Sequence, residues 1–341
     1  MKRALVTGAG GFLGLYVVEQ LVARGVRVRA IARNRYGQLD RLGVESLQGD
    51  LRDPQVALDA CSQVDVVFHT AGVAGLWGPW NYYFGINTLA TQNVIAGCWR
   101  QHVPRLVYTS SPSVTFDGRD QQGVNEAVPY PSRWLCHYPH TKALAEQHVL
   151  QANGQQGLLT CSLRPHLIWG PRDRHLIPRL LQRARRGRLR QVGAGTNLID
   201  MVYAENAAAA HLQAAEALVS GSPVCGQAYF ISQGEPVNCW DWITEILALA
   251  GLPPVRKKIS FTAAWRIGAM LEGAYSVLRL KGEPSMTRFL AAQLARDHYF
   301  DISRARADFG YAPLVSTAAG MQRLADECAV NHRVLGGRSS R

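Results

Sequence analysis

Tyr138 and Lys142 stand four residues apart in the segment Tyr138-Pro-His-Thr-Lys142. Residues at this spacing share one face of a helix, so we expect the phenol and the ammonium to lie close together. A neighbouring ammonium lowers the pKa of a phenol, which is about 10 in water. Tyr138 would then give a proton to a ketone during its reduction, or take one from an alcohol during its oxidation. The pair therefore predicts proton transfer at a carbon–oxygen bond.

A hydroxyl-rich segment, Thr109-Ser-Ser-Pro-Ser113, precedes this pair by about one helical unit and follows an apolar strand. A serine hydroxyl at such a strand end can bond the substrate oxygen and stabilise the charge that develops on it. The segment therefore predicts the hydroxyl donor of the same site.

The first glycine-rich turn, Val6-Thr-Gly-Ala-Gly-Gly-Phe-Leu-Gly14, lies between a strand and a helix. In this context the glycines allow a tight turn, close approach to a pyrophosphate and close packing of the helix on the sheet. The free N–H groups at the helix N-terminus would face the phosphates. We predict a dinucleotide here, bound by Gly8, Gly11, Phe12, Leu13 and Gly14.

Cofactor choice is usually decided at the end of the second strand. An acid there would bond the ribose 2′-OH of NAD, but this chain has Ala32 followed by Arg33. Arg33 can pair with a 2′-phosphate, which favours NADP(H) over NAD(H). Further along, Asp50 can accept from the adenine amino group. Leu51 and Ala71, which follow later strands, are predicted beside the same cofactor.

The elements that must position these residues alternate between strand and helix. Apolar runs at 4–7, 26–32, 65–69, 105–109 and 160–164 read as strands, and 12–23 and 87–100 read as helices. This rhythm predicts an α/β fold, a Rossmann-type doubly wound parallel sheet with a smaller, mixed C-terminal substrate domain. We place the NAD(P)-binding domain at 1–170, with later strands returning from about 196–235. Residues 171–341 are mainly substrate-binding, with helices expected at 176–190 and 240–250.

The overall composition limits the classes of binding partner that we expect. The chain has 37 basic and 25 acidic residues, a net charge of +12, and no nucleic-acid-binding motif accompanies that excess. The charge indicates solvated faces or an anionic partner, such as a phosphorylated cofactor, an acidic substrate or an anionic membrane surface. The seven cysteines form no metal-ligand spacing, so we predict no metal and free thiols in a reducing cytoplasm.

The stretch 261–280 is the most apolar of the later segments, but it contains Arg266, Glu272 and Arg279. A charge near the centre of a lone membrane span costs about 2.5–3.5 kcal/mol on insertion scales. We therefore expect an amphipathic helix that packs on the protein or lies on a membrane surface, rather than a span. Nothing in the sequence decides the oligomeric state, and a homodimer stays open.

The order TGxxGxxG, GDL, a serine-rich strand end and YxxxK resembles the extended short-chain dehydrogenase/reductase family. Leu163-Arg-Pro-His-Leu-Ile-Trp-Gly-Pro-Arg-Asp173 and the segment from Gly195 to Asn206 are similar to its 3β-hydroxysteroid dehydrogenase branch. That branch includes sterol-4-carboxylate 3-dehydrogenases and 2-alkyl-3-oxoalkanoate reductases. The resemblance covers about residues 3–325 and is most specific at the YxxxK and RPxxIxGP segments.

By position, the resemblance implies that Tyr138 is the proton donor or acceptor, Lys142 its modulator and a holder of the nicotinamide ribose, and Ser111 the hydroxyl donor. Pro112 follows Ser111 where other members place their catalytic hydroxyl, so Ser110 and Ser113 stay open. Pro165 is expected beside the cofactor.

The resemblance implies a bulky lipid-like substrate with a 3-oxo or 3-hydroxy group. The aromatic loop that contains Trp77 would line an apolar cleft, and Arg172 and His175 would meet a carboxylate. Two alternatives remain: an NAD-dependent nucleotide-sugar epimerase or dehydratase on the same fold, and a nucleotide-sensing protein without turnover. Ala32-Arg33 argues against the first, and the intact Tyr138/Lys142 pair argues against the second.

Overall fold

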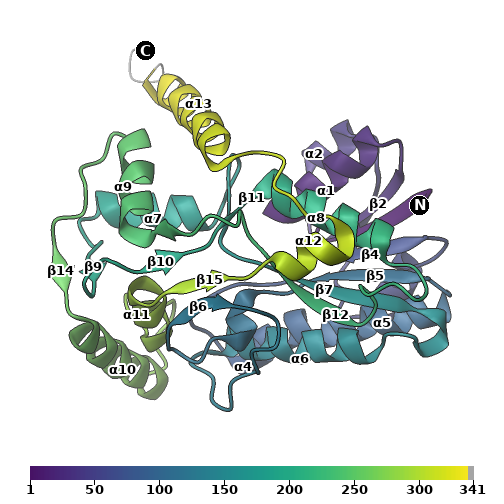
Figure 1. The fold of residues 1–341 in the computed structure, drawn as a ribbon, viewed down its shortest axis with the longest axis horizontal. Coiled ribbons are helices and arrows are strands. Elements are labelled where there is room, and N and C mark those ends of the chain that lie inside the picture. The colour runs from purple at the N-terminus through teal and green to yellow at the C-terminus, as the bar shows by residue number, and fades with distance from the viewer. Residues whose placement is uncertain (337–341) are drawn as a thin grey trace.

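The central sheet is built from seven parallel strands. The structure, a computed structural model, describes residues 1–336. Within them the strand order is β3-β2-β1-β4-β5-β7-β12 (Figure 1). The doubly wound parallel sheet predicted from the sequence is confirmed. The strands span β1 Arg3–Thr7, β2 Arg27–Ala32, β3 Glu45–Gln48, β4 Val66–His69, β5 Arg105–Thr109, β7 Leu159–Pro165 and β12 Gln227–Ile231.

Helices cover both faces of this sheet. The strands require this cover because their side chains are apolar on both faces. One face is covered by α3 Pro54–Ala60, α5 Ala90–Arg100 and α6 His137–Gln151. The other is covered by α1 Phe12–Ala23, α2 Gly37–Arg41, α8 Ala204–Ala217 and α12 Ser303–Phe309. The buried side of α8 is mostly alanine, which lets α1 and the sheet approach it closely.

The remaining elements form a smaller mixed part beside the carboxyl edge of the sheet (Figure 1). Its strands are β6 Gln121–Val124, β10 Leu198–Ile199, β13 Val237–Asn238 and β15 His298–Phe300, with the pairs β8 Ile168–Trp169/β11 Val202–Tyr203 and β9 Gln191–Val192/β14 Lys258–Ile259. Its helices are α7 Leu176–Arg185, α9 Cys239–Leu249, α10 Phe261–Val277, α11 Arg288–Ala295 and α13 Thr317–Gly336. Their core is apolar and separate from those of the sheet.

Two predicted helices have different ends from those expected. The helix predicted at 87–100 begins as α5 at Ala90, and the short helix α4 Trp80–Tyr83 and a π-helical turn, Phe84–Leu89, precede it. The Asn87 amide in this π-turn bonds the Val73 backbone and the Thr141 hydroxyl. The helix predicted at 176–190 stops at Arg185, because Gly187 adopts a left-handed conformation, with φ of +62°, that ends it.

Helix α10 occupies most of the apolar stretch at 261–280. Among the described residues, no helix is both long and apolar enough to cross a membrane. One face of α10 packs on α11, where Ala264 and Gly268 are buried. A Cβ on Gly268 would lie 2.7 Å from the Arg288 backbone nitrogen, so glycine is required at this contact.

Candidate active site

The phenol of Tyr138 lies against the two hydroxyls of Ser111 and Ser113. Tyr138 is in the first turn of α6, and the serines are at the start of the short 3₁₀-helix Pro112–Thr115 that follows β5. Burial raises the pKa of Tyr138, and the nearby hydroxyls of Ser111 and Ser113 oppose that rise. The serine hydroxyls also bond each other at 2.8 Å. The structure thus brings the predicted proton donor together with two of the three candidate serines.

Ser110 is directed elsewhere. Its side chain is buried beside Glu146, where it lowers the pKa of that carboxyl group. Among the three candidates, only Ser111 and Ser113 therefore share the Tyr138 side of the strand end.

Lys142 lies one turn after Tyr138, and its ammonium contacts strand β5. Its Nζ donates to the carbonyl oxygen of Thr109 at 2.5 Å and lies 4.2 Å from the centre of the Tyr108 ring. Burial lowers the pKa of this ammonium to about 7. The Lys142 ammonium is thus bonded to the Thr109 carbonyl, and its effect on the pKa of Tyr138 stays a prediction.

A buried chain of hydrogen bonds, which sequence reasoning missed, connects β1 to α6, the helix that contains Tyr138. The His69 ring forms hydrogen bonds with the Thr7 hydroxyl at 2.7 Å and with the Thr91 hydroxyl at 2.9 Å. Thr91 donates to the Asn87 carbonyl at 2.6 Å, and the Asn87 amide donates to Thr141 of α6 at 3.1 Å. Burial and nearby Lys142 lower the pKa of His69 to about 3, so this ring is neutral. The chain fixes the position of α6.

A buried ion pair, also missed, holds the other side of α6 on the sheet. Glu146 and Arg164 are almost fully inaccessible, with side-chain exposures of 0% and 4%, and their closest atoms are 2.6 Å apart. Tyr130 and Ser162 also donate to this carboxylate, at 2.7 and 2.8 Å. Arg164 belongs to the Arg-Pro segment singled out in the sequence, and its role here is to anchor the helix that carries Tyr138.

The glycine turn forms a cradle that fits a pyrophosphate. Gly8 has φ of +64°, and a Cβ there would lie 2.7 Å from the Ala71 backbone. A Cβ on Gly14 would lie 2.4 Å from the carbonyl oxygen of Gly8. Gly11 is the N-cap of α1 and provides no side-chain acceptor for the first-turn N–H groups, which include those of Phe12 and Leu13. These groups are thus free for an anion, and no acidic residue in the first turn repels one.

The other predicted cofactor residues lie at the carboxyl ends of neighbouring strands. Arg33 is exposed after β2 and close enough to Asp50 to lower the pKa of that carboxyl, although Arg52, bonded to Asp50 at 2.6 Å, has the larger effect. Asp50 is thus already paired. The Leu51 side chain is buried in the core, and Pro165 is the last residue of β7.

An apolar cluster adjoins Tyr138 and Ser113. It combines the segments that flank these residues with α10 and α11, and it consists of Leu76, Phe116, Leu135, Cys136, Phe261, Trp265, Phe289 and Ala292. Trp77, predicted to contact substrate, continues this cluster, because its ring meets Tyr275 of α10 edge to face at 6.3 Å.

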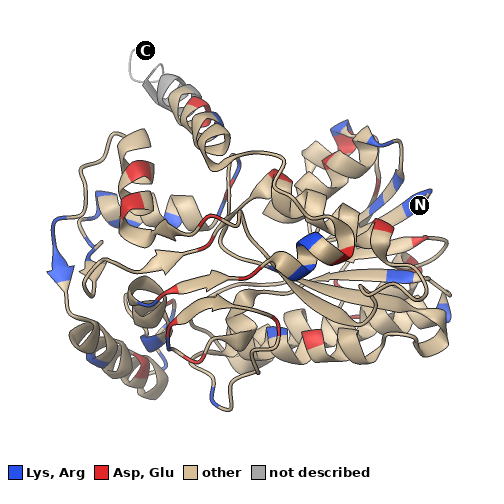
Figure 2. Ribbon diagram, viewed as in Figure 1, with Lys and Arg blue, Asp and Glu red and all other residues tan. Residues whose placement is uncertain are grey.

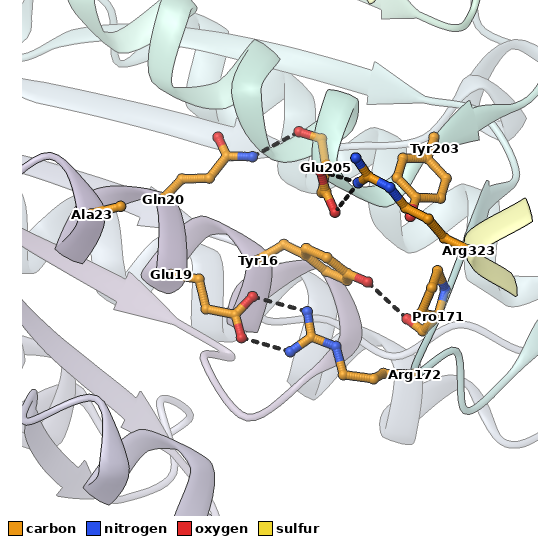
Figure 3. Close-up of a pocket in the computed structure, with 9 residues that line it drawn as sticks. All are labelled: Tyr16, Glu19, Gln20, Ala23, Pro171, Arg172, Tyr203, Glu205 and Arg323. Carbon is orange, nitrogen blue, oxygen red and sulfur yellow. Dashed lines mark hydrogen bonds and ion pairs between the residues drawn. The ribbon is translucent and has the colours of Figure 1, made fainter. Parts of the chain in front are cut away.

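Arg172 lies away from this cluster. Its guanidinium forms two hydrogen bonds with Glu19 of α1, at 2.6 and 2.9 Å, and lies over the Tyr16 ring (Figure 3). These residues border an open hollow of about 440 Å³ on the side of the sheet opposite α6. Both cations of this hollow, Arg172 and Arg323, are paired with carboxylates (Figure 3). We therefore leave Arg172 out of the substrate site. His175 is exposed before α7.

The fold and this geometry define a Rossmann-type oxidoreductase of the short-chain dehydrogenase/reductase kind. Residues 5–262 match the 3-beta hydroxysteroid dehydrogenase/isomerase family, to which this chain belongs. The chain is thus an enzyme that depends on a nicotinamide cofactor and acts on CH–OH groups.

Individual relatives agree with this assignment. The chain is 49% identical to a 2-alkyl-3-oxoalkanoate reductase of Shewanella oneidensis, over 95% of this chain and 86% of the relative. It is 34% identical to the decarboxylating sterol-4-alpha-carboxylate 3-dehydrogenase of Homo sapiens, over 94% of this chain and 87% of the relative. Among solved structures, MoeE5 in complex with UDP-glucose and NAD is 25% identical, with a TM-score of 0.75 over 96% of this chain and 99% of MoeE5.

Proposed function

We propose that this enzyme reduces the 3-oxo group of a 2-alkyl-3-oxoalkanoate with long apolar chains, using NADPH. The observation that carries the proposal is the apolar cluster that adjoins Tyr138 and Ser113. A polar sugar nucleotide would gain nothing from these aromatic and aliphatic side chains, whereas an alkyl chain gains about 0.8 kcal/mol for each buried CH₂ group. The relative named as a 2-alkyl-3-oxoalkanoate reductase supports the same substrate class.

The chain's own residues divide the work at the carbonyl group. When bound, the nicotinamide cofactor supplies the hydride. The Tyr138 phenol gives its proton to the substrate oxygen, and its raised pKa keeps that proton on the phenol at neutral pH. Ser111 and Ser113 donate hydrogen bonds to the same oxygen and stabilise its developing charge. Lys142, anchored on Thr109, would hold the nicotinamide ribose from the other side.

The preference for NADPH rests on Arg33. No acid stands at the end of β2, where it would bond a ribose 2′-OH and repel a 2′-phosphate. Arg33 is exposed there, and no ion pair engages it within the described part of the chain. Arg35 is exposed two residues later and adds a second cation to the same strand end.

The smaller part of the molecule would select the substrate. We propose that residues after about 170, apart from those that return to the sheet, form the substrate domain. Its helix α7 lies near the aromatic loop, because Arg179 pairs with Glu283, which accepts from the Leu76 N–H at 3.5 Å. His175, just before α7, is our proposed contact for the substrate carboxylate.

The test is a panel of substrates with both cofactors. We expect oxidation of NADPH with 2-alkyl-3-oxoalkanoates, with kcat/KM rising about fourfold for each added CH₂ group while the chain fits the cluster. Trp265→Ala should flatten this dependence, and Trp99→Ala, which changes a tryptophan on α5 far from the cluster, should leave its slope unchanged. A rate independent of chain length would contradict the proposed substrate.

Two further compounds separate the competing functions. A 3-oxosteroid preferred over every 2-alkyl-3-oxoalkanoate would assign the enzyme to the sterol side of the family. Conversion of UDP-glucose without net consumption of cofactor would instead show that the enzyme is a nucleotide-sugar epimerase.

A further inference from the structure

The outward face of α10 is apolar, in contrast to an ordinary surface helix. Ile267, Met270 and Val277 are 42%, 74% and 81% exposed, whereas the face that packs on the protein contains a carboxylate, Glu272, bonded to Arg288 at 2.6 Å. Leu278 and Leu280, just beyond the helix, are also exposed. Within the described residues, five of the ten large apolar side chains that are exposed thus lie in the stretch 267–280. Such clustering marks an interaction surface rather than scattered surface residues.

Cations gather beside this face. The end of α7 and the turn after it have four exposed arginines, and the segment that enters β14 adds three exposed basic residues. Together they are Arg185, Arg186, Arg188, Arg190, Arg256, Lys257 and Lys258. The two groups are adjacent, because β9 and β14 pair in parallel, with Lys258 opposite Gln191. None of the seven forms an ion pair with any side chain that the structure describes.

The cations and the apolar face are continuous along the chain. Ser260 follows β14 directly and caps α10 through the N–H of Ala263. Arg266, Arg279 and Lys281 are exposed among the apolar side chains. Figure 2 shows β14 as a basic strand directly before α10 at one edge of the molecule. We call this surface the basic–apolar strip: the seven cations above, the three just named, and the five exposed apolar residues.

We propose that the basic–apolar strip docks on a membrane surface that contains anionic phospholipids. Anionic headgroups match its ten cations, and the acyl boundary below them accepts the five apolar side chains. Nucleic acid or an acidic protein would match the charges but would leave these apolar side chains in water. The strip lacks a spanning helix, so the contact is peripheral.

Docking would also place the active site beside the lipid. The inner face of α10 contributes Trp265 to the apolar cluster and Tyr275 to the contact with Trp77. A lipid-like substrate could then enter between α10 and the aromatic loop without crossing water. This consequence rests on the proposed function, whereas the docking itself does not.

The experiment measures binding of the full chain to vesicles without substrate. We expect the protein to float with phosphatidylcholine vesicles that contain about one third phosphatidylglycerol, and to be released at about 0.5 M salt. The triple variant Arg256→Glu/Lys257→Glu/Lys258→Glu should lower the partition coefficient on the order of 100-fold or more. The control triple Arg27→Glu/Arg41→Glu/Arg100→Glu makes the same charge change on the sheet domain and should bind more tightly than the strip variant by at least tenfold.

A second pair of variants tests the apolar part. Met270→Asp should weaken binding on the order of tenfold, and Leu314→Asp, at another exposed apolar residue, should leave it within about twofold. Absence of vesicle binding by the wild type, or equal binding by the two triple variants, would overturn the proposal. Vesicle binding that Met270→Asp leaves intact would show that the apolar side chains do not enter the bilayer, and would also contradict the proposal. All variants should retain turnover of a short, water-soluble substrate, so a failure of docking is distinguishable from a failure of the proposed function.

Discussion

The two parts of this molecule place different kinds of side chain around the candidate active site. Around α6, the sheet domain buries ionisable groups: Lys142, His69, and the pair Glu146–Arg164. On its side of the site, the smaller part contributes aliphatic and aromatic side chains from α10 and α11. Its buried ionisable groups include Asp200, Glu272 and His298. Buried charges need partners in fixed positions, whereas apolar packing tolerates many combinations of similar volume.

This difference supports our proposal that one part holds the chemistry and the other selects the substrate. In the sheet domain, hydrogen bonds from β5 and β7 and the buried chain that begins at β1 hold α6, so Tyr138 meets Ser111 and Ser113 in a defined geometry. Beside them, α10 and α11 contribute side chains whose size would set the space for the alkyl chain of the proposed substrate. The predictions below test this division, from the largest expected effect to the smallest.

Removing the Tyr138 hydroxyl should have the largest effect on turnover. In Tyr138→Phe the ring remains, and Ser111 and Ser113 can still bond each other. We expect kcat to fall on the order of 1,000-fold, the size of general acid catalysis, with little change in the dissociation constant for NADPH. Steady-state kinetics and fluorescence titration measure the two quantities. Turnover close to that of the wild type would remove Tyr138 from the mechanism.

Breaking the buried ion pair should mainly change stability. Arg164→Met leaves the Glu146 carboxylate buried without its cation, which costs about 3–5 kcal/mol in the free energy of unfolding. Urea denaturation measures this loss. The control Arg323→Met breaks the exposed pair with Glu205 and should cost no more than about 1 kcal/mol. Similar losses for both variants would show that α6 does not depend on the buried pair.

The two serines should both contribute to turnover. Ser111→Ala and Ser113→Ala each remove one of the two serine hydroxyls beside the Tyr138 phenol. We expect kcat to fall on the order of 10- to 100-fold in each variant. Ser110→Ala, which faces Glu146, should affect kcat less than either and stability more. A kcat unchanged in Ser113→Ala would leave Ser111 as the single hydroxyl donor.

The buried ammonium of Lys142 predicts a specific dependence of stability on pH. The folded protein loses this proton near pH 7, while the unfolded chain keeps it up to about 10.5, so the unfolded state binds more protons between these values. Stability should therefore rise with pH in this window, by about 2 kcal/mol between pH 7 and 9 relative to Lys142→Met. Unfolding free energies of both proteins at the two pH values give the difference. A difference that does not change with pH would show that Lys142 titrates normally.

Arg33 should have the smallest of these effects, on cofactor choice alone. Arg33→Asp replaces the cation with an acid that can bond a ribose 2′-OH, and we expect the ratio of kcat/KM for NADPH over NADH to fall about tenfold or more. Arg27→Asp, at the opposite end of β2, is the matched control. An unchanged ratio in Arg33→Asp would refute the proposed preference.

The sheet domain could be predicted because its signals are local. The glycines at 8, 11 and 14, the strand ends and the Tyr138–Lys142 spacing each follow from neighbouring residues, and the parallel sheet is confirmed. The buried chain of hydrogen bonds through His69 and Asn87 could not be predicted, because it depends on a π-turn and on threonines from three separate segments. The direction of the Lys142 side chain depends on the Thr109 carbonyl, which helical spacing does not reveal.

The proposed substrate site was harder to predict from the sequence. The apolar cluster joins residues from 76 to 292, and no periodicity links them. Arg172 was expected to bind a substrate carboxylate, but its guanidinium bonds Glu19, more than 150 positions earlier in the chain. Long-range pairing of this kind is fixed by tertiary structure, whereas the motifs reveal only which groups are present.

The central claim is net reduction of a 3-oxo acid by hydride transfer at the Tyr138 site. The most direct test supplies NADPH with deuterium at both C4 positions and a long-chain 2-alkyl-3-oxoalkanoate, and follows the product by mass spectrometry. The account predicts a 3-hydroxy product with one deuterium at carbon 3, formed in step with NADPH oxidation. A product without deuterium, or turnover that consumes no cofactor, would contradict it.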